Sequence, residues 1–159
     1  MRALVQRVRR AEVRVLVPRP NLIPDDPGDL VGQIGAGMVV LLGVGTEDTS
    51  EDARYLAGRL GHLRIFNDDA GRLNRSLLDV EGEVLSISQF TLYADTRGGR
   101  RPSFVRAAPP EAAEPLYREF NRALETMGVR VVPGRFGAHM VVQIHNDGPV
   151  TILLDSRER

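Results

Sequence analysis

The alternation of apolar and polar side chains predicts several short strands. In residues 4–8 and 13–17, β-branched residues alternate with Arg and Gln at a period of two, which is typical of strands. We expect these two strands to pair with each other. The apolar run at residues 38–44 is bounded by glycines and predicts a strand that is covered on both faces. Three more strands are predicted near the C-terminus, at residues 129–132, 140–144 and 150–154.

Two other segments carry apolar side chains at helical spacing. Residues 49–52 have the Thr-Ser-Glu-Asp pattern of a capping box, and apolar residues recur after them every three or four positions as far as Leu63. A second helix is predicted to start at Pro109-Pro110 and to stop at Gly128, because proline suits the first turn of a helix and glycine suits its end.

The remaining segments complete the expected architecture. Residues 18–32 contain four prolines, three aspartates and two glycines, so we predict an exposed loop there. Residues 83–92 are predicted to form a strand that ends in a polar cluster. Strands outnumber helices without regular alternation, which favours a mixed sheet covered by two helices over a doubly wound parallel fold. No repeat or linker divides the chain, and we expect residues 1–159 to form a single domain.

Composition narrows the classes of function. The 159 residues are 42% hydrophobic and include no cysteine, which excludes disulfides, thiolate catalysis and cysteine-based metal sites and favours an intracellular protein. The three histidines lack ligand spacing, so neither a metal nor another cofactor is expected. We find no targeting signal and no apolar run near the length of about 20 residues that spans a bilayer. The protein is therefore expected to be cytoplasmic, without a membrane partner.

Charge is balanced overall but unevenly distributed. A net charge of zero argues against a protein that holds nucleic acid by bulk electrostatics, and no DNA partner is expected. Arginines nevertheless gather in residues 1–14 and in residues 95–106. In the second group, Arg97, Arg100 and Arg101 flank two glycines and are suited to clamping phosphates, although a solvated surface loop has the same composition.

Two short motifs are candidates for chemistry. Ser88-Gln89-Phe90-Thr91 stands at the end of a predicted strand, where hydroxyl and backbone N–H groups can meet a ligand or merely satisfy local backbone groups. No GxSxG elbow and no histidine with an acidic partner accompanies Ser88 by pattern. The second motif, residues 146–151 with the sequence Asn-Asp-Gly-Pro-Val-Thr, is typical of a hairpin turn between the last two strands. The sequence leaves open whether its Gly-Pro bond is cis.

Together these segments resemble the D-aminoacyl-tRNA deacylase family in order and spacing. The resemblance covers nearly the whole chain, and its two signatures, SQxxL and NxGPxT, are specific as a pair. The matching segments are residues 1–8, 40–44, 88–96, 101–104 and 146–151. The resemblance implies a compact α/β fold, in which mixed β-sheets are layered with two main helices in a β/β/α-type, barrel-like arrangement. It also implies a homodimer with active sites at the subunit interface and aminoacylated tRNA as the partner. The segment 18–32 is longer than the turn usual in the family.

The resemblance also assigns roles to residues. The expected reaction is hydrolysis of the ester of D-aminoacyl-tRNA, and of glycyl-tRNA mischarged on non-cognate tRNA. The residues expected to hold the ester are Ser88, Gln89, Phe90 and Thr91. Those expected to reject L-amino acids are Gly148 and Pro149, a Gly-cisPro element from the neighbouring subunit, with Asn146 and Thr151 beside it. The arginines expected to contact tRNA are Arg97, Arg100 and Arg101.

The expected mechanism needs little machinery. Backbone N–H groups near Phe90 and Thr91 would stabilise the oxyanion while water attacks with help from the 2′-hydroxyl of the substrate. Thr91 as a nucleophile is the less favoured alternative, because no general base is evident beside it. Two other classes of function stay open: a non-catalytic RNA-binding module that uses the arginine clusters, and a small-molecule esterase that does not need tRNA.

Overall fold

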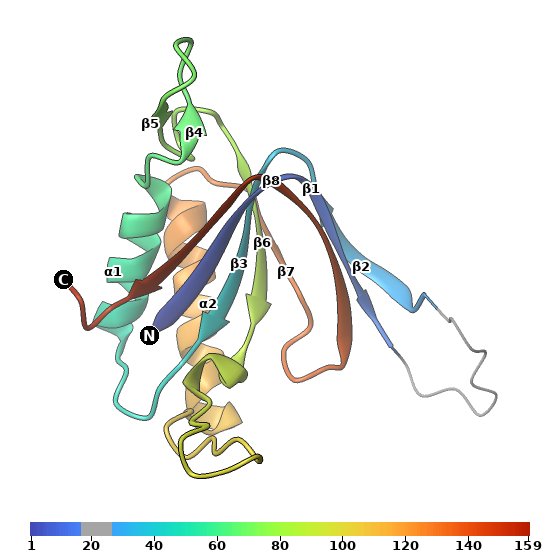
Figure 1. Cartoon of the computed structure of the whole chain (residues 1–159), viewed down its shortest axis with the longest axis vertical. Coiled ribbons are helices and arrows are strands. Elements are labelled where there is room, and N and C mark those ends of the chain that lie inside the picture. The colour runs from blue at the N-terminus through green and yellow to red at the C-terminus, as the bar shows by residue number, and fades with distance from the viewer. Residues whose placement is uncertain (17–26) are drawn as a thin grey trace.

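Strand β1 (Arg2–Val15) organises the sheet, because three other strands pair with it in antiparallel fashion. In the computed structural model, which describes residues 1–16 and 27–159, the first half of β1 lies beside β3 (Gly37–Gly43) and its second half beside β2 (Asp29–Ile34). Along its other edge β1 pairs with β8 (Met140–Asp155) over almost its whole length. Figure 1 shows that β1 and β8 bend together, so the sheet folds over on itself.

The sheet continues beyond β3 through two parallel strands. β6 (Glu83–Ser88) pairs with β3, and β7 (Val131–Pro133) pairs with β6. The result is a six-stranded mixed sheet in the order β2-β1-β3-β6-β7, with β8 on β1. Strands β4 (Phe66–Asn67) and β5 (Leu73–Arg75) form a separate short hairpin, and a 3₁₀ helix η1 (Phe90–Tyr93) follows β6.

Two helices pack against each other and cover one face of the sheet (Figure 1). Helix α1 (Ser50–Gly61) begins as predicted, and the Asp52 carboxylate accepts hydrogen bonds from the backbone N–H and the hydroxyl of Thr49. Helix α2 (Pro110–Thr126) starts at the predicted prolines and buries a stripe that includes Phe120 and Leu124. Within the described ranges, neither helix is long and apolar enough to cross a membrane.

Alternate residues of the central strands face two separate cores. Val40 of β3 and Val84 of β6 pack with the helices, whereas Val39 and Leu85 pack with the bent part of β1 and with β2. All four side chains are fully buried. Burial of a valine or leucine side chain contributes about 1.5–3 kcal/mol, so both faces of the central strands stabilise the layers. The predicted coverage of residues 38–44 on both faces and the layered, barrel-like α/β fold are confirmed.

The prediction of separate strands at residues 4–8 and 13–17 is wrong, as is the hairpin between residues 140–144 and 150–154. Residues 4–8 and 13–15 belong to one long strand, β1, residue 17 lies outside the described residues, and both C-terminal segments belong to β8. Residues 9–12 contain no turn-forming residue, and the change in the period-two pattern comes instead from irregular pairing of β1 with β8 around Val8. The Asn-Asp-Gly-Pro motif occupies that irregularity, where it bends β8 without reversing its direction.

The predicted loop at residues 18–32 needs a partial correction. Residues 18–26 lie outside the described residues, and Asp29–Gly32 form the first part of β2, paired with β1. A Cβ atom on Gly32 would collide with the Val132 side chain of β7, so glycine allows β2 to lie against β7. Strand β6 ends at Ser88 rather than at residue 92, because its partner β3 ends at Gly43 and offers no further ladder.

Candidate active site

A cavity of about 600 Å³ opens beside the end of β6. Its walls come from β3, β6, the first turns of α2 and the segment that leads into β8, so residues far apart in the sequence meet there. The lining is mainly apolar and aromatic, and includes Leu42, Ile87, Phe90, Phe104, Tyr117 and Phe136. A concave, mostly apolar pocket with a few polar groups at one edge is the usual form of a small-ligand site.

The predicted motif at the end of β6 supplies the polar edge. Ser88, Gln89 and Phe90 line the cavity, and Thr91 follows just outside it. The Gln89 backbone N–H donates to the Leu42 carbonyl at 2.7 Å, which fixes the chain as it leaves the sheet. The Gln89 side-chain amide donates to the Thr91 hydroxyl oxygen. The structure therefore brings three of the four predicted residues to the cavity wall.

Within the described part of the chain, two backbone donors have no partner at this point. Phe90 and Thr91 open the 3₁₀ helix, so their N–H groups have no carbonyl partner inside it, and no side chain caps the helix. The next backbone N–H, that of Leu92, already bonds to the Gln89 carbonyl at 3.3 Å. Adjacent N–H groups with this geometry are suited to binding an anionic oxygen.

Aromatic side chains form the rim and the base of the cavity. The Phe90 and Phe104 rings meet edge to face, with 5.0 Å between centroids, and both are exposed. At the base, the Tyr117 hydroxyl donates to the Ser86 carbonyl at 2.7 Å. Burial raises the pKa of Tyr117, so its hydroxyl stays protonated and remains a donor.

Sequence reasoning missed several of these lining residues. Tyr117 lies within the predicted second helix, for which no functional role is predicted, and Phe136 and His139 lie in a segment without a motif. The aromatic residues of the second helix carried a usable signal, since Tyr117 is a large polar-tipped residue on a buried face. No comparable signal marks Phe136 or His139.

The Asn-Asp-Gly-Pro motif forms a well-supported projection from β8. The Asn146 amide donates to the Arg7 carbonyl at 2.8 Å and to the Val150 carbonyl at 3.1 Å, and it accepts from the Thr151 hydroxyl at 3.4 Å. Gly148 and Pro149 are exposed, and the peptide bond between them is cis. Gly148 has a φ of +115°, a conformation that side chains disfavour.

Arg7 holds this projection from below. Its buried guanidinium donates to the carbonyls of Ile65 at 2.7 Å and Asp147 at 3.3 Å and to the Asn67 side chain at 3.0 Å, and it pairs with the Asp147 carboxylate at 3.1 Å. A guanidinium with this many acceptors is locked in place. The arginine that the sequence placed in a basic cluster is therefore part of the scaffold.

The two motifs lie at opposite ends of the sheet in one chain. Val8 pairs with both Asn146 and Gly37, whereas Ser88 pairs with Leu42 at the other end of β3. Five residues of strand separate the two levels, which corresponds to about 17 Å along the strands. In Figure 1 the bend of β8 lies near β4 and β5, and η1 lies at the opposite end. One chain therefore does not bring Gly148-Pro149 to the cavity.

The arginine loop divides into bound and free side chains. Arg97 pairs with Asp95 through two nitrogens, at 2.6 and 3.0 Å, and this contact lowers the pKa of Asp95 well below its usual value. Arg100 and Arg101 are exposed and form no ion pair within the described part of the chain. Among residues 1–16 and 27–159, no group of three or more His, Asp and Glu side chains is arranged to hold a metal.

The sequence matches one family along almost its whole length. The family described as D-Tyr-tRNA(Tyr) deacylase matches residues 4–155. The chain is 54% identical over 159 residues to a D-aminoacyl-tRNA deacylase of Thermus aquaticus, with 100% of this chain and 97% of the relative covered. It is 56% identical over 155 residues to a D-aminoacyl-tRNA deacylase of Deinococcus deserti, with 98% of this chain and 99% of the relative covered.

Two solved structures share the fold of this chain. A protein titled c-Myc DNA Unwinding Element Binding Protein superposes with a TM-score of 0.85 at 39% identity, covering 98% of each chain. A probable eukaryotic D-amino acid tRNA deacylase superposes with a TM-score of 0.78 at 20% identity, covering 96% of this chain and 97% of the other. At that lower identity the likeness shows the fold.

Proposed function

Because the chain belongs to the D-Tyr-tRNA(Tyr) deacylase family, we propose that it hydrolyses the ester bond of D-aminoacyl-tRNA and releases the free D-amino acid and tRNA. The observation that carries this proposal is the cavity whose edge is formed by the Ser88–Phe90 segment, with the free N–H groups of Phe90 and Thr91 beside it. The cavity offers space for part of the substrate, and the N–H pair offers the charge stabilisation that ester hydrolysis needs.

The proposed reaction follows from these groups. The oxygen of a water molecule adds to the ester carbonyl carbon, and the Phe90 and Thr91 N–H groups stabilise the oxyanion that forms. The 2′-hydroxyl of the terminal ribose assists as the 3′-oxygen leaves with a proton. Thr91 is not the nucleophile in this proposal, because its hydroxyl contacts the neutral amide of Gln89 and no general base.

The apolar cavity suits the terminal adenosine of the tRNA. Its aromatic lining, with Phe90 and Phe104 at the rim, provides faces on which a flat base can pack. If the nucleoside fills the cavity, the D side chain points outward and makes few contacts. Broad specificity for D-amino acids then follows, with no requirement for a particular side chain.

Selectivity against L-amino acids is assigned to Gly148 and Pro149 of a second copy. Rejection by about 10⁴-fold requires about 5.5 kcal/mol, which a collision with rigid backbone supplies more readily than a loss of contacts. Two features support this role. The projection is exposed yet fixed by Asn146, Thr151 and Arg7, and it lies too far from the cavity of its own chain to act there.

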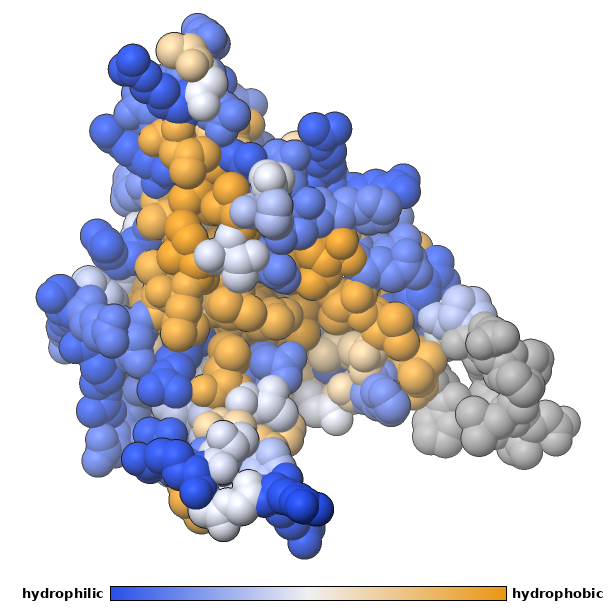
Figure 2. Space-filling model, viewed as in Figure 1, coloured by the Kyte–Doolittle hydropathy of each residue, from blue (hydrophilic) through white to orange (hydrophobic). Residues whose placement is uncertain are grey.

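A homodimer therefore belongs to the proposal. A two-fold arrangement would present the projection of each chain to the cavity of the other. Apolar side chains extend across the face on which β1 and β8 lie (Figure 2). Val141 and Leu153 of β8 are among the exposed large apolar residues. Exposed apolar surface of this kind commonly marks an interface. Light scattering should give twice the chain mass.

The remaining parts of the proposal concern the RNA. Arg100 and Arg101 are free to contact phosphates near the cavity, whereas Arg97 is engaged by Asp95. The N-terminal arginines are largely committed within the chain, for example Arg7 and Arg2, which disfavours an RNA-binding module built on that cluster. We place the enzyme in the cytoplasm, where aminoacylated tRNA is used, and propose no DNA partner.

The decisive experiment compares three substrates with the purified protein. Hydrolysis of D-tyrosyl-tRNA, with L-tyrosyl-tRNA spared, is the expected result. A small-molecule esterase would cleave a D-tyrosine ester without RNA equally well, and an RNA-binding module would leave all three intact. Either outcome would overturn the proposal.

A further inference from the structure

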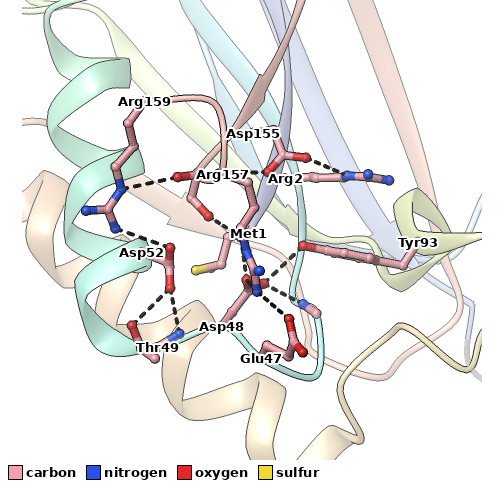
Figure 3. Close-up of polar contacts among 12 residues, drawn as sticks. Met1, Arg2, Glu47, Asp48, Thr49, Asp52, Tyr93, Asp155, Arg157 and Arg159 are labelled. Carbon is pink, nitrogen blue, oxygen red and sulfur yellow. Dashed lines mark hydrogen bonds and ion pairs between the residues drawn. The ribbon is translucent and has the colours of Figure 1, made fainter.

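The first residues of β1 brace the 3₁₀ helix beside the cavity. Arg2 donates from Nη1 to the Leu92 carbonyl at 3.0 Å, and its guanidinium lies over the Tyr93 ring at 4.9 Å from the centroid (Figure 3). Its Nε pairs with Asp155 of β8 at 2.9 Å, so the guanidinium cannot swing away freely. The last two residues of η1 are thus held by a cation that the sheet itself fixes.

A second brace reaches Tyr93 through Asp48. The Asp48 carboxylate is buried, with a side chain only 1% exposed. Its closest counter-charge is the Met1 α-ammonium at 2.7 Å, and Arg157 Nη2 lies further away at 3.8 Å. It also accepts from the Gly45 backbone N–H at 2.6 Å and from the Tyr93 hydroxyl at 3.1 Å. Because a buried charge is costly unless it is paired, loss of the closest cation, the Met1 ammonium, would leave the Asp48 carboxylate with only the more distant Arg157.

The Tyr93 hydroxyl is fixed as a donor in this network. Burial and the neighbouring Asp48 charge raise the pKa of Tyr93 above its usual value, so the phenol stays protonated. Figure 3 shows the ammonium of Met1, the carboxylate of Asp48 and the hydroxyl of Tyr93 in contact in that order. Since η1 is a single short turn from Phe90 to Tyr93, a shift of Tyr93 moves the Phe90 and Thr91 N–H groups as well.

We infer that Arg2, Asp48 and Tyr93 are positioning residues for the hydrolysis, and that the charged Met1 amino group is the fourth member of this support. The inference rests on the proposed deacylase function. These groups do not touch the substrate. They set the position of two N–H donors, and the stabilisation that these donors give depends on their distance from the oxyanion. A displacement near 1 Å is enough to lower a rate by about 100-fold.

The same network makes the Met1 nitrogen a site where modification would matter. A formyl or acetyl group on this nitrogen removes its positive charge and adds atoms where Met1 is fully buried. Asp48 would then be left without its closest cation, and the one N–H that remains on the nitrogen could serve either Asp48 or the Ser156 hydroxyl, but not both. We therefore expect the acylated chain to deacylate D-aminoacyl-tRNA more slowly than the free-amine form.

The first test is Tyr93→Phe, which removes only the hydroxyl and leaves the ring under Arg2. We expect kcat for D-tyrosyl-tRNA to fall about three- to tenfold with KM within about twofold, because the donors act in the transition state. Tyr55→Phe is the matched control. Tyr55 also lies under an arginine, Arg159, at 4.9 Å from the ring centroid, but it belongs to α1 and is not among the residues that line the cavity. Its kcat should equal that of the parent.

The second test compares one preparation before and after its amino group is freed. A short leader is fused ahead of Met1 and removed by a protease that leaves Met1 as the first residue. Single-turnover deacylation should be slow before removal and should reach the parental rate afterwards. Thermal unfolding of both forms shows whether the leader also lowers stability, and the parent incubated with the protease is the control.

The outcomes separate the inference from the function on which it rests. A Tyr93→Phe protein with lower thermal stability but parental kcat would show a purely structural role and would overturn the inference. An equal rate before and after leader removal would do the same. A parent that leaves D-tyrosyl-tRNA intact would overturn the proposed function and this inference together. Should the leader-bearing chain not fold, Tyr93→Phe alone decides.

Discussion

Gly148→Ala is expected to weaken rejection of L-amino acids. At a φ of +115°, an alanine is strained, and its Cβ would lie 2.8 Å from the Val150 side chain, 3.0 Å from the Val150 backbone nitrogen and 3.1 Å from Arg7 Nη2. Neither neighbour can retreat easily, since one is backbone and the other is fixed by Ile65 and Asn67. The projection must therefore move or bear a strain of about 1–3 kcal/mol.

The magnitude of the functional effect follows from that strain. If the projection moves to relieve it, the collision with an L side chain weakens by a similar free energy, so the ratio of D to L rates should fall about 5- to 150-fold. Single-turnover deacylation of D- and L-tyrosyl-tRNA measures the ratio directly. Thermal unfolding reports how much strain remains in the folded protein.

Gly71→Ala provides the control for backbone strain alone. Gly71 also has a positive φ, +76°, but a Cβ there meets nothing within 4 Å, and it lies in the turn between β4 and β5. We expect a modest loss of stability and an unchanged ratio of D to L rates. A Gly148→Ala protein that keeps both the parental ratio and the parental thermal stability would refute the role assigned to the projection.

Four further results are expected. Thr91→Val should keep the deacylation rate within about tenfold, or about 1.4 kcal/mol, and a trapped acyl-threonine would contradict the water mechanism. Replacing Arg100 and Arg101 together with Ala should raise KM and flatten its salt dependence, and parental kinetics at every salt concentration would make the loop a mere solvated surface. Glycyl-tRNA on a non-cognate tRNA should be hydrolysed, because glycine has no side chain to reject; resistance equal to that of L-alanyl-tRNA would show that the pocket grips the D side chain. Burial raises the pKa of Asp52, but hydrogen bonds led by that from the Thr49 backbone outweigh it and lower the pKa from 3.8 to about 2. Its carboxylate thus stabilises the fold above a pH of about 4 and loses this effect as the pH falls toward 2. Asp52→Asn should therefore lower the free energy of unfolding by about 1 kcal/mol at pH 7 and by less at low pH. An equal loss of stability at both pH values would contradict the assignment.

The fold was predictable wherever a local pattern decides the structure. Helix α1 and strand β3 follow from a capping motif and an apolar run, which depend on near neighbours. The continuity of β1 and β8 was not predictable, because the irregular pairing around Val8 is set by residues about 140 positions away. A sequence also cannot show that the motif at Ser88 meets Phe136 in one cavity, or that Gly148 lies at the far end of the sheet.

The roles of the residues were only partly readable for the same reason. The arginines near the N-terminus are the same residue type but have different structural roles. Arg7 is buried and supports the projection, whereas Arg2 braces η1. The charge of a residue in the sequence does not show whether its side chain is buried. The hydrogen-bond partners that decide these roles are the backbone carbonyls of Ile65 and Leu92. Every residue type has such a carbonyl, so the sequence does not reveal these partners.

The distance between the cavity and the Gly148-Pro149 projection has a genetic consequence. If each complete site draws one part from each chain, two alleles that are inactive for different reasons can restore each other. A chain with a damaged η1 segment and a chain with a damaged projection would form mixed pairs in which one of two sites is intact. With random pairing, about a quarter of all sites would then be whole, although neither allele alone yields any. A single chain that holds both defects would instead inactivate both sites of every dimer that it forms with an intact chain.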